Sequence, residues 1–177
     1  MRNLTKYFLY LLLFLGVFIL FLPKEQLFIY AVNKLYNEKI YLKDYTYKES
    51  LISTNIKNTN IIYDSINIAN INNIKSELFL VYNNVDIRNI KLDDSLNSFV
   101  PSKIRYININ YNILKPLYIY SKVDTKQYSV KIKFDILNLK IKAIFKTSQF
   151  FRKKYPKLLR ELKYDKDVKD YTYEYKL

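Results

Sequence analysis

Histidine and cysteine are both absent from this chain of 177 residues, which narrows the chemistry available to it. Without histidine there is no imidazole for acid–base catalysis, for a Ser-His-Asp triad or for a metal site. The single glycine, Gly16, lies in an apolar run, so glycine-rich phosphate loops are also excluded. Among the 16 carboxylates no pair has a spacing typical of acid–base catalysis, and Asp93 with Asp94 is typical of a turn. We therefore expect no enzyme activity, no cofactor and no metal centre.

Positive charge is the main chemical feature that remains. The net charge is +14, which favours acidic partners such as nucleic acid, anionic lipid headgroups or acidic proteins. An AT-rich genome that enriches Lys, Asn, Ile and Tyr is the alternative source of this charge. The densest cluster lies in residues 146–163, where it is either the solvated face of a helix or a surface for an acidic partner or phospholipid headgroups. The candidate binding residues in this cluster are Arg152, Lys153, Lys154, Lys157, Arg160 and Lys163.

Tyrosines interleaved with lysines offer a third chemistry, the stacking of single-stranded nucleic acid. The residues concerned are Tyr106, Tyr111, Tyr118 and Tyr120. Tyrosine is also a good strand former, so the same pattern fits a plain β-sheet. DNA binding is therefore a hypothesis that has to compete with a structural explanation.

An uncharged run over residues 7–22 is the element that would position this chemistry in the cell. At about 1.5 Å per residue it covers roughly 24 Å, and snorkelling of Lys6 with local thinning can match it to a bilayer core of ~30 Å. We predict a single transmembrane helix. The residues expected to span the membrane include Tyr7, Phe8, Leu12, Phe14, Gly16, Phe18, Leu20 and Leu22.

The basic residues before this run also fit a secretory signal peptide that is removed. Residues 21–26 lack the small side chains that cleavage requires, so we predict an uncleaved signal anchor. The expected organisation is a cytoplasmic N-terminus at 1–6, an anchor at 7–23, a juxtamembrane amphipathic helix at 24–39 and a β domain at 40–177. Positive charge before the anchor, with a long segment after it, favours a cytoplasmic N-terminus and an external or periplasmic C-terminal domain.

The periodicity of the apolar residues changes from helical to alternating after residue 39. In 24–39 the expected inward stripe is Leu27, Ala31 and Leu35, with Phe28 and Val32 beside it. From residue 40 to 146 short alternating runs about ten residues apart predict an antiparallel meander. The clearest runs, 128–136 and 139–145, should pair as a hairpin with Leu137 and Asn138 in the turn.

The scarcity of glycine implies that tight turns use Asn, Asp or Ser. The pairs predicted as turns are Asn72–Asn73, Asn83–Asn84 and Asp93–Asp94. A helix over 148–163, capped by Ser148, should precede a last strand around Tyr171–Tyr175; at Pro156 this helix either kinks or a new helix begins. The expected fold class is mainly β (α+β), a transmembrane helix followed by a curved antiparallel meander with a flanking helix.

Four segments carry a resemblance to a known family. They read FLPKEQL, FVPSKI, YSVKIKFDILNLKIKAIFKTS and DYTYEYKL. Together with the overall layout they resemble the GspN proteins of type II secretion systems and their AsmA-like relatives, and most of all the small inner-membrane members found in transformation systems. The resemblance implies a non-enzymatic component of a secretion or DNA-uptake machine, with partners among the inner-membrane platform, its bitopic subunits and the secretin.

Two functions therefore compete. The first is an assembly or scaffold role in such a machine at the inner membrane. The alternative is an AsmA-like groove for lipids or other hydrophobic ligands, since a sheet with one apolar face can leave that face open. These differ in whether the helix over 151–162 fills the inner face of the sheet.

Overall fold

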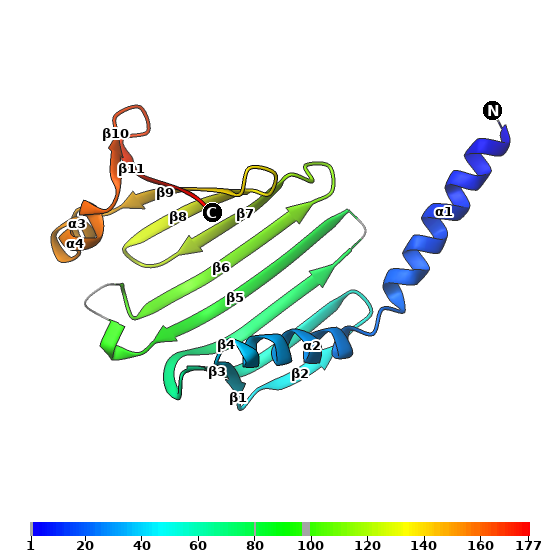
Figure 1. Cartoon of the computed structure of the whole chain (residues 1–177), viewed down its shortest axis with the longest axis horizontal. Helices are drawn as coiled ribbons and strands as arrows, with labels where there is room; N and C mark the ends of the chain where they lie inside the picture. The colour runs from blue at the N-terminus through cyan, green and yellow to red at the C-terminus, as the bar shows by residue number, and fades with distance from the viewer. Residues whose placement is uncertain (1, 80, 97–99) are drawn as a thin grey trace.

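The computed structural model describes residues 2–79, 81–96 and 100–177. Two helices, α1 (Arg2–Leu20) and α2 (Lys24–Asn37), lead into one large sheet (Figure 1). The sequence predicts a membrane span over residues 7–22; within the described ranges, no helix is both long enough and apolar enough to cross a membrane. Leu22 lies in the connection between the two helices, and Pro23 occupies the N-cap position of α2.

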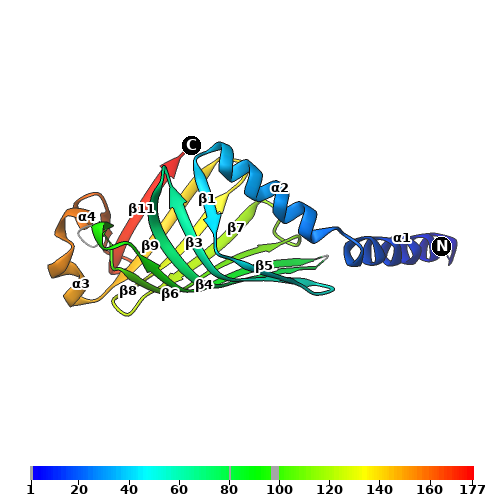
Figure 2. The ribbon, with the colours of Figure 1, turned by 90° about the horizontal axis from the view of Figure 1, so that it is seen from below.

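The sheet is antiparallel throughout and has 11 strands within the described ranges. They are β1 (Ile40–Lys43), β2 (Thr46–Glu49), β3 (Ser53–Tyr63), β4 (Ile66–Leu78), β5 (Tyr82–Leu92), β6 (Lys103–Asn112), β7 (Tyr118–Asp124), β8 (Tyr128–Asp135), β9 (Lys140–Thr147), β10 (Lys163–Asp165) and β11 (Asp170–Lys176). Their order is β1-β3-β4-β5-β6-β7-β8-β9-β11-β10, and β2 pairs with β3 beside β1. The predicted mainly antiparallel β fold is confirmed. Figure 2 shows that the sheet is curved, with β4, β5 and β6 at its base.

Two asparagines with left-handed backbone keep one face of this sheet apolar. Asn58 in β3 and Asn89 in β5 both have φ of 55°. Each asparagine lies between two regular cross-strand pairs. There it shifts by one residue the pattern in which side chains alternate between the two faces of the sheet. Ile87 and Ile90 are three residues apart and yet join the same apolar cluster as Ile71. A sequence that loses its period of two in mid-strand can therefore still form one long strand.

Two of the predicted asparagine turns are wrong. Asn72–Asn73 lies inside β4 and Asn83–Asn84 inside β5. The Asn84 side chain is paired across the sheet with Asn108 of β6, so its amide serves the sheet and not a turn. The third pair, Asp93–Asp94, does follow β5 and leads into a short 3-10 helix, Asp94–Leu96.

The predicted β8–β9 hairpin is confirmed by its register, in which Asp135 pairs with Lys140. The left-handed residue of its turn is Leu139, with φ of 49°, and not Asn138. Asn138 instead donates to both carboxylate oxygens of Asp135 at 3.0 Å. These hydrogen bonds hold the pKa of Asp135 below its usual value.

Two short helices, α3 (Gln149–Lys154) and α4 (Pro156–Arg160), replace the single helix expected over 148–163. Ser148 caps α3 as predicted, its hydroxyl accepting from the Phe151 amide at 3.1 Å. Pro156 cannot donate within a continuing helix, so it begins α4 instead. Lys163 consequently belongs to β10 rather than to a helix.

Candidate functional site

The concave face of the sheet is lined by apolar side chains in continuous rows. Residues paired across neighbouring strands point to the same face, so the register identifies each row. One row consists of Ile56, Ile74, Ile87, Ile107, Val123, Val130, Phe145 and Tyr171. The next consists of Val85, Ile109, Ser121, Ile132, Ala143 and Tyr173. Ile109 and Tyr173 remain 37% and 39% exposed, so this apolar face is not fully covered.

Helix α2 covers this face only near β1 and β2. The Phe28 ring packs on Tyr45 and Tyr47, with centroids 5.4 and 5.0 Å apart, and Tyr47 pairs with Ile56 of the concave row. Burial, together with the nearby Glu49 carboxylate, raises the pKa of Tyr47 to about 12. The predicted inward stripe of α2 is therefore wrong by about one residue. Lys24, Phe28 and Val32 face inward, because only this stripe can bring Phe28 onto the two tyrosines, while Leu27, Ala31 and Leu35 are exposed.

Helices α3 and α4 lie beyond the ends of β8 and β9 and not across the concave face (Figures 1 and 2). Phe151 is fully buried, with its ring 4.6 Å from Tyr128 and 4.9 Å from Tyr155. This aromatic cluster fixes the two helices to one end of the sheet. The segment 151–162 therefore does not fill the inner face of the sheet.

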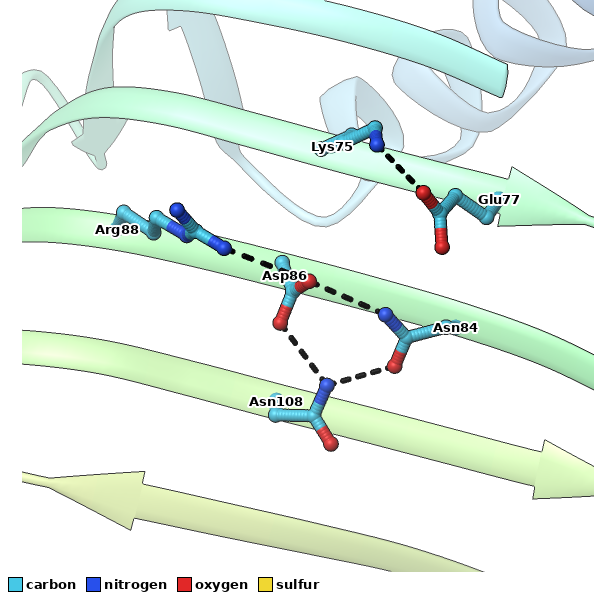
Figure 3. A network of polar contacts seen from close by, with 6 residues as sticks. All are labelled: Lys75, Glu77, Asn84, Asp86, Arg88 and Asn108. Atoms are coloured by element: carbon cyan, nitrogen blue, oxygen red, sulfur yellow. Dashed lines mark hydrogen bonds and ion pairs between the residues drawn. The ribbon is translucent and has the colours of Figure 1, made fainter.

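The convex face is polar and internally paired (Figure 3). Asn108 donates to Asn84 at 2.6 Å and to Asp86 at 2.9 Å, and Asn84 donates to Asp86 at 3.1 Å. Arg88 lies 3.9 Å from Oδ2 of Asp86, the oxygen that also accepts from Asn84. Because each of these groups already has a partner, the network stabilises the sheet and offers little to a ligand.

A second polar cluster joins β9 to β11. Glu174 accepts from Lys140 at 2.7 Å and from Lys142 at 3.1 Å. These two hydrogen bonds hold the pKa of the Glu174 carboxyl below its usual value. This cluster also borders a hollow of about 580 Å³ that is lined by residues of β9, β10 and β11 together with Glu161.

The structure divides the predicted basic cluster instead of gathering it on one face. Arg152 is used internally: it donates to the Thr147 hydroxyl at 3.0 Å and lies 3.7 Å from Asp170. Lys153 and Arg160 are exposed, Lys163 lines the hollow beside β10, and the side chain of Lys157 lies outside the described part of the chain.

Lys154 belongs to a different group that the sequence did not reveal. It lines a hollow of about 270 Å³ together with Lys103 and Lys126, Gln127 and Tyr155. None of these three lysines forms an ion pair within the described ranges. They come from three segments that only the topology brings together, so no spacing in the sequence could have predicted the group.

The four tyrosines predicted to stack nucleic acid do not form one platform. Tyr111 is on the concave face, where it pairs with Ile119, whereas Tyr106, Tyr118 and Tyr120 are on the convex face. Lysines already cover two of these rings: Lys122 lies 5.3 Å from the Tyr106 centroid and Lys133 lies 3.7 Å from that of Tyr118. DNA binding stays a prediction, which a steep loss of affinity between ~50 and ~200 mM salt would test.

The residues predicted to span the membrane are mostly exposed along α1. Among these, Tyr7, Phe8, Leu12, Phe14, Phe18 and Leu20 are exposed, and Gly16 and Leu22 are half-buried. No protein-family description, no curated protein and no solved structure matches this chain. Within the described ranges no three acidic side chains gather where they could hold a metal ion.

Proposed function

We propose that this chain is a non-enzymatic, membrane-associated protein whose concave sheet face holds the acyl chains of lipids. The observation that carries the proposal is the position of α3 and α4 at one end of the sheet, with Ile109 exposed and Ile107, Val123 and Ile132 only half-buried on the concave face. An apolar surface of this extent gains free energy when an apolar occupant replaces water.

A lipid is the occupant that fits the rest of the molecule. The Leu and Phe side chains of α1 are exposed around the helix, which suits hydrocarbon surroundings. The side chains of the two concave rows are mostly Ile, Val, Phe and Tyr, and the row that contains Ile109 carries only two hydroxyl groups, those of Ser121 and Tyr173. Such a surface recognises chain length and shape more than it recognises polar groups, as lipid binding requires.

Two lysine substitutions test the proposal at positions that are similarly exposed but lie on opposite faces of the sheet. Ile109 and Tyr120 lie on neighbouring strands and are 37% and 38% exposed, but they face the concave and convex sides respectively. Ile109→Lys should abolish lipid retention, because a charge would lie among the acyl chains, whereas Tyr120→Lys should retain it. Native mass spectrometry of the full chain released from detergent measures the bound lipid. Equal retention by the two variants, or no lipid on the wild-type chain, rejects the proposal.

A second candidate function, assembly within a secretion-like or DNA-uptake machine, is favoured by an open strand edge. β10 pairs only with Asp170, Tyr171 and Thr172, so the outer edge of β11 from Tyr173 onward has no partner strand in the described ranges. Such an edge can receive a strand from another protein. In this proposal the chain lies at the bacterial inner membrane, with α1 held by the bilayer and the sheet in the periplasm.

The partners under this second proposal are the inner-membrane platform, its bitopic subunits or the secretin. A photo-crosslinker at Tyr175 should capture one of these subunits, and the same crosslinker at Lys57, on the far side of the sheet, should not. A deletion strain with normal DNA uptake and normal secretion would exclude the assembly role. The orientation of α1 is tested separately by reporter fusions before residue 6 and after residue 177.

A further inference from the structure

The turns at one end of the sheet are apolar, although turns of soluble domains are usually polar. The antiparallel register brings together at this end the turns β2–β3, β4–β5, β6–β7 and β8–β9 with the end of β11. Their exposed side chains include Leu51, Phe79, Leu114, Leu137, Leu139 and Leu177. We call this end of the sheet the apolar rim.

Backbone hydrogen bonds connect the turns β4–β5, β6–β7 and β8–β9 of the apolar rim to one another and to the end of β11. The Ile113 amide donates to the Val81 carbonyl at 3.0 Å, and the Ile136 amide donates to the Leu117 carbonyl at 2.9 Å. The Leu177 amide donates to the Leu139 carbonyl at 2.9 Å. Leu114 and Leu137 are 78% and 71% exposed, so the side chains project from the sheet instead of packing on it.

The opposite end of the sheet has a different character. Its turns contain Asp64 with Ser65, Asp93 and Lys126. In the rim turns 50–52, 113–117 and 136–139 the one charged residue is Lys115. The apolar character of the rim turns is therefore not due to a shortage of polar turn residues in this chain, because the turns at the opposite end contain them.

Helix α1 extends from the end of the sheet where the apolar rim lies, as both views show (Figures 1 and 2). We propose that the apolar rim docks on the lipid bilayer that holds α1, with its Leu, Ile and Phe side chains inserted past the headgroups into the outer part of the hydrocarbon. Among apolar partners a bilayer is favoured because the rim is continuous with α1, and because Lys115 can reach anionic headgroups while no carboxylate lies in those turns. The inference rests on the membrane association in the proposed function but not on lipid binding by the concave face.

Single tryptophans test this docking, because the chain contains none. The full chain would carry Leu114→Trp in the rim, Phe150→Trp at the opposite end or Tyr10→Trp in α1, each reconstituted into vesicles of phosphatidylcholine and phosphatidylglycerol. Lipids brominated along the acyl chain quench a tryptophan that reaches the hydrocarbon. We expect blue-shifted and quenched emission for Leu114→Trp and Tyr10→Trp, and unquenched emission for Phe150→Trp, which is exposed at 60%.

The three probes separate the possible failures. Quenching of Tyr10→Trp without quenching of Leu114→Trp overturns the docking of the rim and leaves membrane association intact. If neither Tyr10→Trp nor Leu114→Trp is quenched, both the docking of the rim and membrane association are overturned. If Phe150→Trp is quenched as strongly as Leu114→Trp, the proposal that the rim end of the sheet faces the bilayer is overturned. A blue shift of Leu114→Trp that depends on protein concentration and not on bromination identifies a second copy as the partner and also overturns the proposal. Asp in place of Leu114 and Leu137 should detach the rim, so that a Leu139→Trp probe in that variant loses its quenching.

Discussion

Replacing Phe151 with alanine should release α3 and α4 from the sheet. Phe151 is fully buried between Tyr128 and Tyr155, and removing a buried phenyl ring costs about 3–5 kcal/mol. Helices of six and five residues are too short to be stable alone, so they depend on this contact. The loss should appear as local opening, with amide exchange in α3 and α4 accelerated at least roughly 100-fold, since each 1.4 kcal/mol is about a factor of ten.

Hydrogen exchange read by mass spectrometry on the full chain measures this effect, and Phe150 supplies the control. Phe150 precedes Phe151 in the same helix but is 60% exposed, so Phe150→Ala should change stability by less than about 0.5 kcal/mol. Amides of β6 and β7 should keep their protection in both variants, because neither ring lies on those strands. Equal exchange in the two variants would refute the idea that one buried ring holds these helices at the end of the sheet.

Two further predictions concern the backbone of the sheet and its charge clusters. Asn89→Val should cost about 1–2 kcal/mol, because a β-branched residue is strained at φ of 55°, while Asn89→Gly should be neutral or stabilising; urea midpoints followed by circular dichroism distinguish them. The pKa of Glu174 is lowered on folding, so its contribution to stability is present above the ordinary carboxyl pKa and is lost as the pH falls through the lowered value. The thermal midpoint of wild type should therefore fall toward that of Glu174→Gln on acidification, and a constant difference between pH 7 and pH 3 would contradict this.

The parts of the fold that alternate regularly could be predicted from the sequence. Strands β8 and β9 keep a strict period of two, so the apolar set of Val130, Ile132 and Phe134 identifies both the strand and its buried face. The long strands β4 and β5 are not predictable in this way, because the apolar residues stop alternating regularly near Asn72 and at Asn89. Asparagine is typical of turns because it tolerates left-handed backbone, but in this protein the left-handed residues Asn58 and Asn89 lie inside strands.

The apolar rim could not be predicted from the sequence either. The spacing of Leu78 and Tyr82 is typical of one strand, although β4 ends at Leu78 and β5 begins at Tyr82. An apolar turn has no local signal that separates it from a strand, since both are short runs of large side chains. Likewise the group formed by Lys103, Lys126 and Lys154 depends on contacts between distant segments, and periodicity carries no information about those.

The rim and the concave face belong to one apolar surface, and this has a consequence for how a lipid could enter. Leu117 of the rim is followed two residues later by Ile119, which pairs with Tyr111 and Phe134 on the concave face. At β9, Leu139 is followed by Ile141 in the same way. A rim docked on a bilayer would thus place hydrocarbon next to the concave rows, with no charged row between them. We expect rim variants such as Leu137→Asp to slow lipid loading while leaving the amount bound at equilibrium unchanged, whereas Ile109→Lys lowers the amount bound.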